Sequence, residues 1–272
     1  MDIPTAHTLP VPGATLYYEI RGSGPLVLLV PGGNGDAGLF DGVAELLADR
    51  YTVVSYDRRG FSRSPCDGEP QRRVDLDAED AALLLAHLAT DPAHVLGSSS
   101  GAIVALELLA RYPGRIRTLV AHEPPLTSLL PDGARWLAFF DEVYETDRRE
   151  GAPAAMAKFT AGVGMRAQPS PPADLPPELA ARMARIQQNM RLWMAQELRG
   201  FPGHEIDPEA LRPAADRLVL GVGADSRDTM PARPNAELAR RLGLHVVEFP
   251  GDHVGYLTSP AEFAERLAKV LH

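Results

Sequence analysis

The chain has 272 residues, a formal net charge of −9 at pH 7 and one cysteine, Cys66. This length suits one large domain, or a core domain with an insertion, and excludes a small disulfide-stapled fold; a lone cysteine is typical of a reducing compartment. The negative charge disfavours binding to nucleic acid or anionic lipid, and no apolar run approaches the roughly 18 residues of a membrane span. We therefore expect a cytoplasmic protein, monomeric or homodimeric, whose partner is a small molecule rather than a nucleic acid or a membrane.

The first part of the sequence alternates between short apolar segments and amphipathic ones. Residues 15–20 alternate as a strand does and predict an N-terminal hairpin, and the continuous apolar run 26–30 suits a strand buried on both faces. The next predicted elements are a helix at 37–48, a strand at 52–56, a helix at 74–89 and a strand at 94–96. Strands that alternate with helices indicate a mostly parallel sheet covered on both faces.

The alternation is interrupted once and then resumes. A helix at 102–110 and a strand at 119–121 precede the segment 124–213, which has two or three amphipathic helices, a proline-rich stretch and no convincing strand. The later elements are a strand at 218–220, a helix at 236–242, a strand at 245–249 and a helix at 261–271. The pattern predicts an α/β core domain, 1–123 and 214–272, with 124–213 inserted as a helical cap over the carboxyl ends of the strands.

The most specific motif is Gly97-Ser98-Ser99-Ser100-Gly101, which matches G-x-S-x-G and lies between a predicted strand and a predicted helix. In such a nucleophile elbow the central serine has a strained backbone, and the glycines let strand and helix approach closely. Ser98 and Ser100 lack glycine at both required offsets. Ser99 is therefore the predicted nucleophile.

A serine nucleophile needs a general base, and in folds that use this elbow a histidine follows the last strand. His253 occupies that place, because it follows Pro250-Gly251-Asp252 and precedes the final predicted helix. Six other histidines fall in the N-terminal segment, helices, strand starts, the cap or the tail, where surface or packing roles are ordinary. His122 precedes Glu123 at the end of a predicted strand and should point away from it if the strand persists, so we expect a packing role for His122 as well. His253 is the predicted base.

Two carboxylates compete to be the acid that holds the histidine in its productive tautomer. Asp225 follows the strand that begins at 218, the commonest place for this acid, although the usual spacing from Gly223 points to the next position, Ser226. Glu123 ends the earlier predicted strand and is followed by two prolines, which would hold it rigidly. Asp225 can instead cap a turn, and Glu123 can be a structural carboxylate at the cap hinge. Spacing alone leaves the choice open.

Acyl transfer also needs two backbone N–H donors for the oxyanion, one after the nucleophile and one in the loop after an early strand. These are Ser100 and Gly33, and the loop 31–35, Pro-Gly-Gly-Asn-Gly, has the freedom to turn an N–H inward. A phosphate-binding loop is the alternative, but the lysine of a P-loop is missing. The histidines and Cys66 show no metal-ligand spacing, so we expect neither a metal nor a cofactor.

Taken together, these motifs resemble the α/β-hydrolase superfamily and, within it, the zearalenone lactonases. The resemblance covers the chain from about Val27 to the final helix. It is carried by Val30-Pro31 leading into Gly33, Phe40-Asp41, Tyr56-Asp57, Gly60, Ser62-Arg63-Ser64, Ser98 to Ala102, and Arg115-Ile116-Arg117 leading into His122-Glu123. It implies an α/β-hydrolase fold and lactone hydrolysis, and it implies Glu123 rather than Asp225 as the acid.

Within the cap, Ala184-Arg185, Asn189 and Trp193 keep the spacing of the lactonases, and Arg199-Gly200-Phe201-Pro202 is similar to their next segment. The resemblance implies that Trp193 packs on the substrate, since a tryptophan at the matching place packs on the aromatic macrolactone. The helical spacing of Ile186, Met190, Trp193 and Met194 supports an alternative, an apolar stripe that faces the sheet domain.

Three features depart from the lactonase pattern. Gly32 stands where the lactonases carry an acidic residue, two prolines rather than one follow Glu123, and four extra residues follow Trp193. These departures leave the exact substrate undetermined, but they do not change the predicted chemistry.

The sequence therefore predicts a serine hydrolase that cleaves a carboxylic ester or lactone, with a zearalenone-type macrolactone as candidate substrate, through Ser99, His253 and Glu123 and an acyl-enzyme. The alternatives are a carbon–carbon bond hydrolase or perhydrolase with the same triad, or a small-ligand receptor with negligible turnover. Dehalogenases and epoxide hydrolases are disfavoured because their nucleophile is an aspartate where Ser99 stands. Fold alone does not decide among them.

Overall fold

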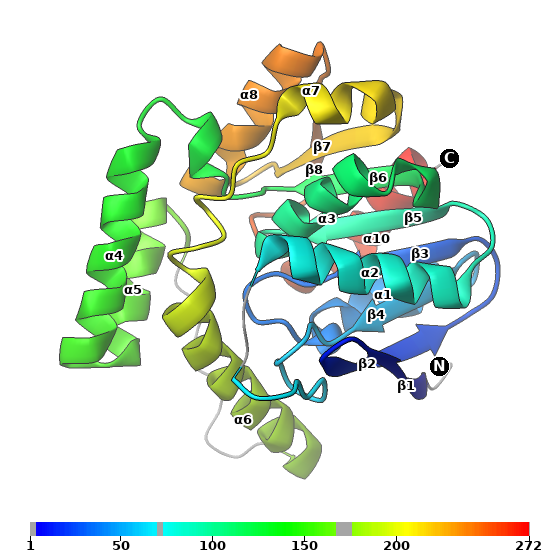
Figure 1. The fold of residues 1–272 in the computed structure, drawn as a ribbon, viewed down its shortest axis with the longest axis horizontal. Coiled ribbons are helices and arrows are strands. Elements are labelled where there is room, and N and C mark those ends of the chain that lie inside the picture. Colours follow the sequence, from blue (N-terminus) through cyan, green and yellow to red (C-terminus); the bar gives the residue numbers. More distant parts are fainter. Residues whose placement is uncertain (1–3, 70–72, 167–175, 272) are drawn as a thin grey trace.

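Eight strands form one sheet at the centre of the computed structural model, which describes residues 4–69, 73–166 and 176–271 (Figure 1). The strands are β1 Thr5–Val11, β2 Ala14–Arg21, β3 Leu26–Val30, β4 Thr52–Tyr56, β5 Ala93–Ser98, β6 Ile116–His122, β7 Leu218–Gly223 and β8 Val246–Phe249. Their spatial order is β1-β2-β4-β3-β5-β6-β7-β8. The pairs β1–β2 and β2–β4 are antiparallel and the other neighbours are parallel, which confirms the predicted, mostly parallel sheet.

Helices cover both faces of this sheet. They are α1 Asp41–Leu47, α2 Val74–Leu88, α3 Ser100–Arg111, α8 Arg233–Leu242 and α10 Pro260–Val270. In β3, Leu28 and Val30 belong to the apolar cluster shared with α2, α3 and α8, whereas Val27 and Leu29 belong to the cluster shared with α1 and α10. Because successive side chains of a strand point to opposite faces, a strand covered on both faces needs an apolar residue at every position. This explains why the run 26–30 does not alternate.

The antiparallel edge of the sheet behaves differently. The β1 residues are mostly exposed, while Leu16 and Tyr18 of β2 are buried between more exposed neighbours. One face of this hairpin therefore packs on the core and the other meets solvent, which is the cause of the alternation at 15–20. In the ranges described above, no helix is both long enough and apolar enough to cross a membrane.

The segment between β6 and β7, which we call the cap, forms several helices, most of which lie beside the sheet, while the last lies next to α8 (Figure 1). It contains α4 Gly133–Glu150, α5 Ala152–Val163, α6 Pro177–Leu192, a π-helical turn Trp193–Glu197 and α7 Pro208–Leu211. Side chains of α4, α5 and the π-helical turn share a third apolar cluster, which includes Phe140, Val163 and Met194. Leu211 of α7 packs instead in the cluster of α3 and α8. The proline-rich stretch lies largely at 167–175, outside the described residues.

Candidate active site

Ser99 sits in the sharp turn between β5 and α3. Its backbone angles are φ 56° and ψ −125°, a conformation that is strained for a residue other than glycine. A Cβ atom on Gly97 would lie 2.4 Å from the carbonyl oxygen of Gly101, and one on Gly101 would lie 2.2 Å from the carbonyl oxygen of Val30. Both glycines of the motif are therefore required by the close approach of α3 to the sheet.

The elbow is anchored to the neighbouring strand. The Ser99 N–H donates to the carbonyl oxygen of His122, the last residue of β6, at 2.9 Å, and the Ser99 carbonyl oxygen accepts from the Ala102 N–H at 2.9 Å. The first turn of α3 thus begins directly after Ser99. A helix N-terminus favours negative charge, as an oxyanion site requires.

His253 lies in the loop between β8 and the short helix α9 Gly255–Thr258. Its Nδ1 is 2.6 Å from Oε2 of Glu123, and both side chains are buried. Two backbone features shape the loop: Gly251 has φ 81°, and the Val254 N–H donates to Oδ1 of Asp252 at 3.0 Å. The structure therefore brings together a histidine and a carboxylate that are 130 residues apart.

Glu123 follows β6 and has φ 50°, which ends the strand there. Its Oε1 accepts from the Gly223 N–H at 2.7 Å and from Oγ of Ser226. Burial alone would raise the pKa of Glu123, but the hydrogen bond and charge of His253, with the hydrogen bond from Ser226, lower it to about 2. The carboxylate is therefore ionised and can stabilise an imidazolium.

The alternative acid occupies a different position. Asp225 is exposed, and its backbone N–H donates to the carbonyl oxygen of Gly251 at 3.0 Å. Among the described residues, no hydrogen bond joins the Asp225 carboxylate to His253. Ser226, at the usual spacing for the acid, is buried and instead donates to Glu123. The end of β7 and the residues after it thus donate two hydrogen bonds to the carboxylate of Glu123, which follows β6.

His122 lies closer to the site than the strand pattern predicted. It is fully buried, its ring centroid is 6.4 Å from that of His253, and it packs edge-on against Phe249 and Phe263. Neither ring nitrogen has a hydrogen-bond partner among the described residues. Burial lowers the pKa of His122 to about 4, so the ring is neutral near neutral pH. A packing role, as expected from the sequence, agrees with these surroundings.

The loop 31–35, which we call the oxyanion loop, lies against the elbow. A Cβ atom on Gly32 would lie 3.0 Å from Cβ of Ser99, and the carbonyl oxygen of Gly32 accepts from the Gly35 N–H at 2.9 Å. The same oxygen accepts from Nη2 of Arg58 at 2.7 Å. Of the two predicted donors, Gly33 directly follows Gly32 in this loop and Ser100 directly follows Ser99 as the first residue of α3. Sequence reasoning missed Arg58, because no local pattern marks its distant partners.

Trp193 covers the oxyanion loop from the cap. A Cβ atom on Gly33 would lie 2.4 Å from Cδ1 and Nε1 of the indole ring, so glycine is required there. Trp193 also contacts Phe159 of α5, with ring centroids 5.1 Å apart in an edge-to-face arrangement. Trp193 is thus both a member of the apolar cap cluster and a neighbour of the candidate catalytic residues.

Polar side chains on one face of α6 attach the cap to the core. Asn189 donates to the carbonyl oxygen of Asn34 and to Oγ of Ser62, both at 2.7 Å, and accepts from the Ser62 N–H at 2.9 Å. One turn earlier, Nε of Arg185 lies 3.4 Å from Oδ2 of Asp36. These contacts recur at helical spacing, so α6 lies along the loop that follows β3.

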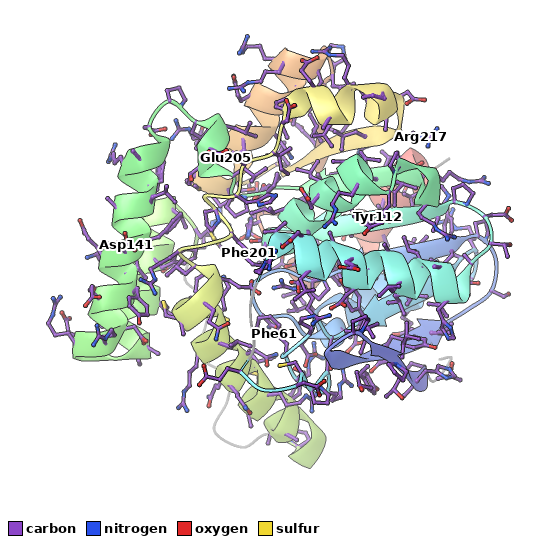
Figure 2. The ribbon with its side chains drawn as sticks, viewed as in Figure 1. Phe61, Tyr112, Asp141, Phe201, Glu205 and Arg217 are labelled. Atoms are coloured by element: carbon purple, nitrogen blue, oxygen red, sulfur yellow. The ribbon has the colours of Figure 1, made fainter. Side chains whose placement is uncertain are left out.

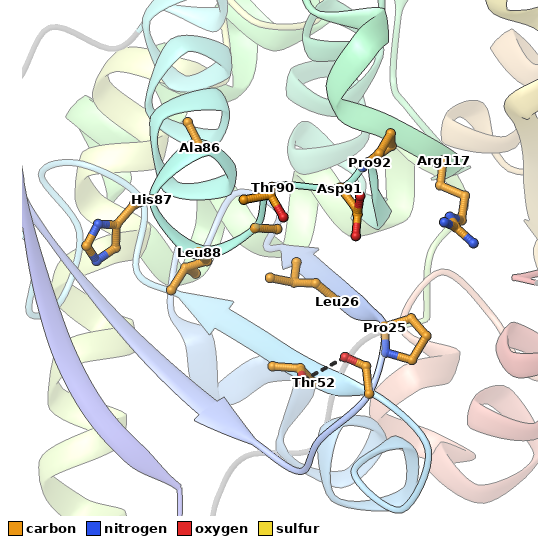
Figure 3. A pocket seen from close by; sticks show the side chains of 12 residues that line it. Pro25, Leu26, Thr52, Ala86, His87, Leu88, Thr90, Asp91, Pro92 and Arg117 are labelled. Atoms are coloured by element: carbon orange, nitrogen blue, oxygen red, sulfur yellow. Dashed lines mark hydrogen bonds between the residues drawn. The ribbon is translucent and has the colours of Figure 1, made fainter.

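Two cavities lie at opposite ends of the strands. A small one of about 50 Å³ adjoins His253, Ser226 and Thr229. A larger open groove of about 550 Å³ is lined by Leu26, Thr52 and other residues where the parallel strands begin (Figure 3). Since Ser99 follows the carboxyl end of β5, the larger groove is remote from the candidate catalytic residues. In the described ranges, no group of three or more His, Cys, Asp or Glu side chains could hold a metal ion.

Comparison with known proteins adds the family. The chain is 37% identical over 269 residues to the uncharacterized hydrolase YraK of Bacillus subtilis, covering 97% of this chain and 95% of YraK. It is 31% identical over 275 residues to the zearalenone hydrolase of Bionectria ochroleuca, covering 96% of each. An alpha/beta hydrolase from Sphaerobacter thermophilus superposes with a TM-score of 0.66 at 26% identity, covering 98% of this chain and 100% of the other. The alpha/beta hydrolase fold family matches residues 25–260, so this chain belongs to the α/β-hydrolase family and is a hydrolase.

Proposed function

We propose that this hydrolase cleaves a carboxylic ester or lactone, with Ser99 as nucleophile, His253 as general base and Glu123 as the acid. The observation that carries the proposal is the buried 2.6 Å hydrogen bond between His253 and Glu123 at the end of the sheet where the strained Ser99 turn lies. Glu123 holds the proton of His253 on Nδ1, which leaves Nε2 free to accept the proton of a serine hydroxyl.

The reaction has two halves. Ser99 Oγ attacks the carbonyl carbon and gives its proton to His253, while the N–H groups of Gly33 and Ser100 bind the oxyanion. The bond to the alcohol oxygen then breaks, and the alcohol takes the proton from His253. Water attacks the resulting acyl-enzyme with His253 again as base, which releases the carboxylic acid and restores Ser99.

The substrate we propose is a macrolactone of the zearalenone type. Two findings support it: the 31% identity to a zearalenone hydrolase along nearly the whole chain, and the indole of Trp193 beside Gly33. An aromatic ring held at the oxyanion loop offers a flat apolar surface on which the aromatic part of such a lactone can pack. Trp193 is therefore the proposed substrate contact.

The test is chromatographic loss of zearalenone with the purified protein, with Ser99→Ala and Ser128→Ala run beside it. Ser128 is an exposed cap serine whose hydroxyl donates only to the carbonyl oxygen of His204 among the described contacts. We expect the parent and Ser128→Ala to convert the lactone into a product one water heavier, and Ser99→Ala to lose this activity.

Other outcomes are equally informative. Turnover that survives in Ser99→Ala would exclude Ser99 as nucleophile. If the protein hydrolysed simple aryl esters but left zearalenone unchanged, the proposed ester chemistry would stand and the macrolactone would be excluded as substrate. Tight binding of zearalenone without turnover would favour a receptor.

A further inference from the structure

A fully buried arginine stands between the cap and the oxyanion loop. Arg58, which follows β4, donates from Nη2 to the carbonyl oxygen of Gly32 at 2.7 Å and to Oε2 of Glu197 at 2.8 Å. Its Nη1 donates to Oδ2 of Asp77 at 2.8 Å. The side chains of Arg58 and Glu197 are both 0% exposed. The proposed ester chemistry assigns no step to either of them.

The surroundings of Arg58 hold its guanidinium in one place. Burial alone would lower the pKa of Arg58, but the carboxylates of Glu197 and Asp77 raise it further above its ordinary value. Its Cζ lies 4.9 Å from the ring centroid of Phe61 and 5.7 Å from that of Phe201, two aromatic residues between the sheet domain and the cap helices (Figure 2). A buried charge that loses one partner is strongly destabilised, so this arrangement resists rearrangement.

The bond to Gly32 sets the orientation of the predicted oxyanion donor. The carbonyl group of Gly32 and the N–H of Gly33 belong to one planar peptide unit, and in a trans unit they point in opposite directions. The described residues contain no cis peptide bond. With the Gly32 oxygen held by Arg58, the Gly33 N–H is turned away from Arg58 and kept in one orientation, next to the glycine that approaches Ser99.

Glu197 brings the cap into this arrangement. It ends the π-helical turn Trp193–Glu197, in which the Leu198 N–H donates to the carbonyl oxygen of Trp193 at 2.9 Å. Residues four positions apart lie on the same side of a helix, so Trp193 and Glu197 face the same way from this turn. The cap therefore contacts this peptide unit twice, by Trp193 on Gly33 and by Glu197 through Arg58.

We propose that Arg58 and Glu197 are positioning residues for the oxyanion hole. Arg58 orients the peptide unit between Gly32 and Gly33, and Glu197 makes that orientation depend on a docked cap. This inference rests on the proposed function, because it assigns the Gly33 N–H to an oxyanion. Without the contact from Glu197, Arg58 would lose one of its carboxylates, and the oxyanion hole would be weakened while Ser99 stayed in place.

The experiment compares Glu197→Gln with Asp80→Asn in hydrolysis of a simple aryl ester. Asp80 is a buried carboxylate that accepts from Nε of Arg59 at 2.7 Å, so its variant also breaks a buried arginine pair, but outside the oxyanion loop. We expect Glu197→Gln to lower kcat about 10- to 100-fold with little change in KM, less than the roughly 10²- to 10³-fold cost of removing a donor. Asp80→Asn should keep kcat within about twofold of the parent, since it leaves transition-state contacts intact.

A second measurement separates positioning from general destabilisation. Phenylboronic acid forms a tetrahedral adduct on a serine nucleophile, and its inhibition constant should rise in parallel with the loss of kcat in Glu197→Gln. If Glu197→Gln does not fold, Arg58→Lys replaces it: lysine keeps the charge but lacks the planar fork that reaches Gly32 and both carboxylates. The same loss of kcat and boronic acid affinity is expected.

The outcomes distinguish this inference from the proposed function. An active parent whose Glu197→Gln variant keeps its kcat and boronic acid affinity would overturn the positioning role alone. Equal losses in Glu197→Gln and Asp80→Asn would also overturn it, because they would mark a general effect of breaking buried pairs. Aryl ester hydrolysis that persists in Ser99→Ala would overturn both the proposed function and the inference.

Discussion

Ser99 and Glu123 share an uncommon backbone conformation, with φ values of 56° and 50°. Each is a non-glycine residue that directly follows a strand. Because its φ is positive, its side chain does not continue the pattern in which successive side chains of the strand point to opposite faces of the sheet. Such conformations cost on the order of 1–3 kcal/mol and persist where the surrounding structure enforces them. Here the enforcing contacts are the hydrogen bonds from the Ser99 N–H to His122 and from the Glu123 N–H to Gly221.

The first prediction concerns which carboxylate supports His253. Glu123→Gln should lower kcat by about four orders of magnitude, as loss of the triad carboxylate does when an amide selects the wrong tautomer. Asp225→Asn, the matched control at the exposed position, should stay within about twofold of the parent. Steady-state hydrolysis of an aryl ester measures both. The opposite ranking of the two variants would make Asp225 the acid.

At the scale of the element, α6 and the π-helical turn form one continuous structure that carries the contacts between cap and core. Asn189 and Arg185 bind the loop after β3, Trp193 covers Gly33, and Glu197 binds Arg58. The other cap helices meet α6 through apolar side chains. Polar contacts therefore hold α6 on the core, while the apolar cluster joins the cap helices to one another and to Phe61 and Met230 of the core.

The second prediction tests the docking of α6. Asn189→Ala removes an amide that makes three hydrogen bonds to Asn34 and Ser62, and we expect a loss of about 1–3 kcal/mol in the free energy of unfolding. Gln188→Ala, which removes an exposed amide from the same helix, should change it by no more than about 0.5 kcal/mol. Urea unfolding gives both values, and limited proteolysis should cut the cap of Asn189→Ala faster. Equal stability of the two variants would contradict this role for Asn189.

At the scale of the whole molecule, two neighbouring residues make stability depend on pH. Glu123 has its pKa lowered from 4.5 to about 2, and His122 has its pKa lowered from 6.5 to about 4. In both cases the unfolded chain binds a proton more readily than the folded protein does. Each group therefore stabilises the fold above its unfolded pKa, and that contribution is lost as the pH falls toward the folded value.

The third prediction follows from these signs. The free energy of unfolding should begin to fall below pH 6.5, because of His122, and should fall more steeply below pH 4.5, where Glu123 adds its contribution. A tenfold difference in proton affinity between the folded and the unfolded protein corresponds to about 1.4 kcal/mol. His122→Leu should flatten the curve between pH 6.5 and 4.5 in urea titrations, whereas Glu123→Gln should flatten it only below pH 4.5. A parent protein with constant stability over this range would contradict the prediction.

A cytoplasmic location, a monomeric or homodimeric state and a small-molecule partner stay predictions, since none of them is tested by the fold. The charge of −9 supports the partner class and the single Cys66 supports the location, but neither bears on the oligomeric state. Size-exclusion chromatography with light scattering would decide the oligomeric state.

The sequence by itself determined the fold and the position of the strained turn at Ser99. Periodicity depends on each segment's own surroundings, so apolar runs and amphipathic stretches predicted strands and helices correctly along the core. The elbow motif is equally local, because its two glycines are needed by contacts within a few residues of Ser99 or with the adjacent strand β3. His253 could be predicted because its place after the last strand follows from chain order.

Only the tertiary structure decided which side chains meet across long separations. The hydrogen bond from His253 reached Glu123 rather than Asp225 because Glu123 leaves its strand at a positive φ and Ser226 turns toward it. Arg58 and Glu197 are 139 positions apart, and no local sequence pattern predicts that they form a pair. Sequence periodicity reports how each element is buried, whereas such contacts depend on sheet order and on where the cap docks.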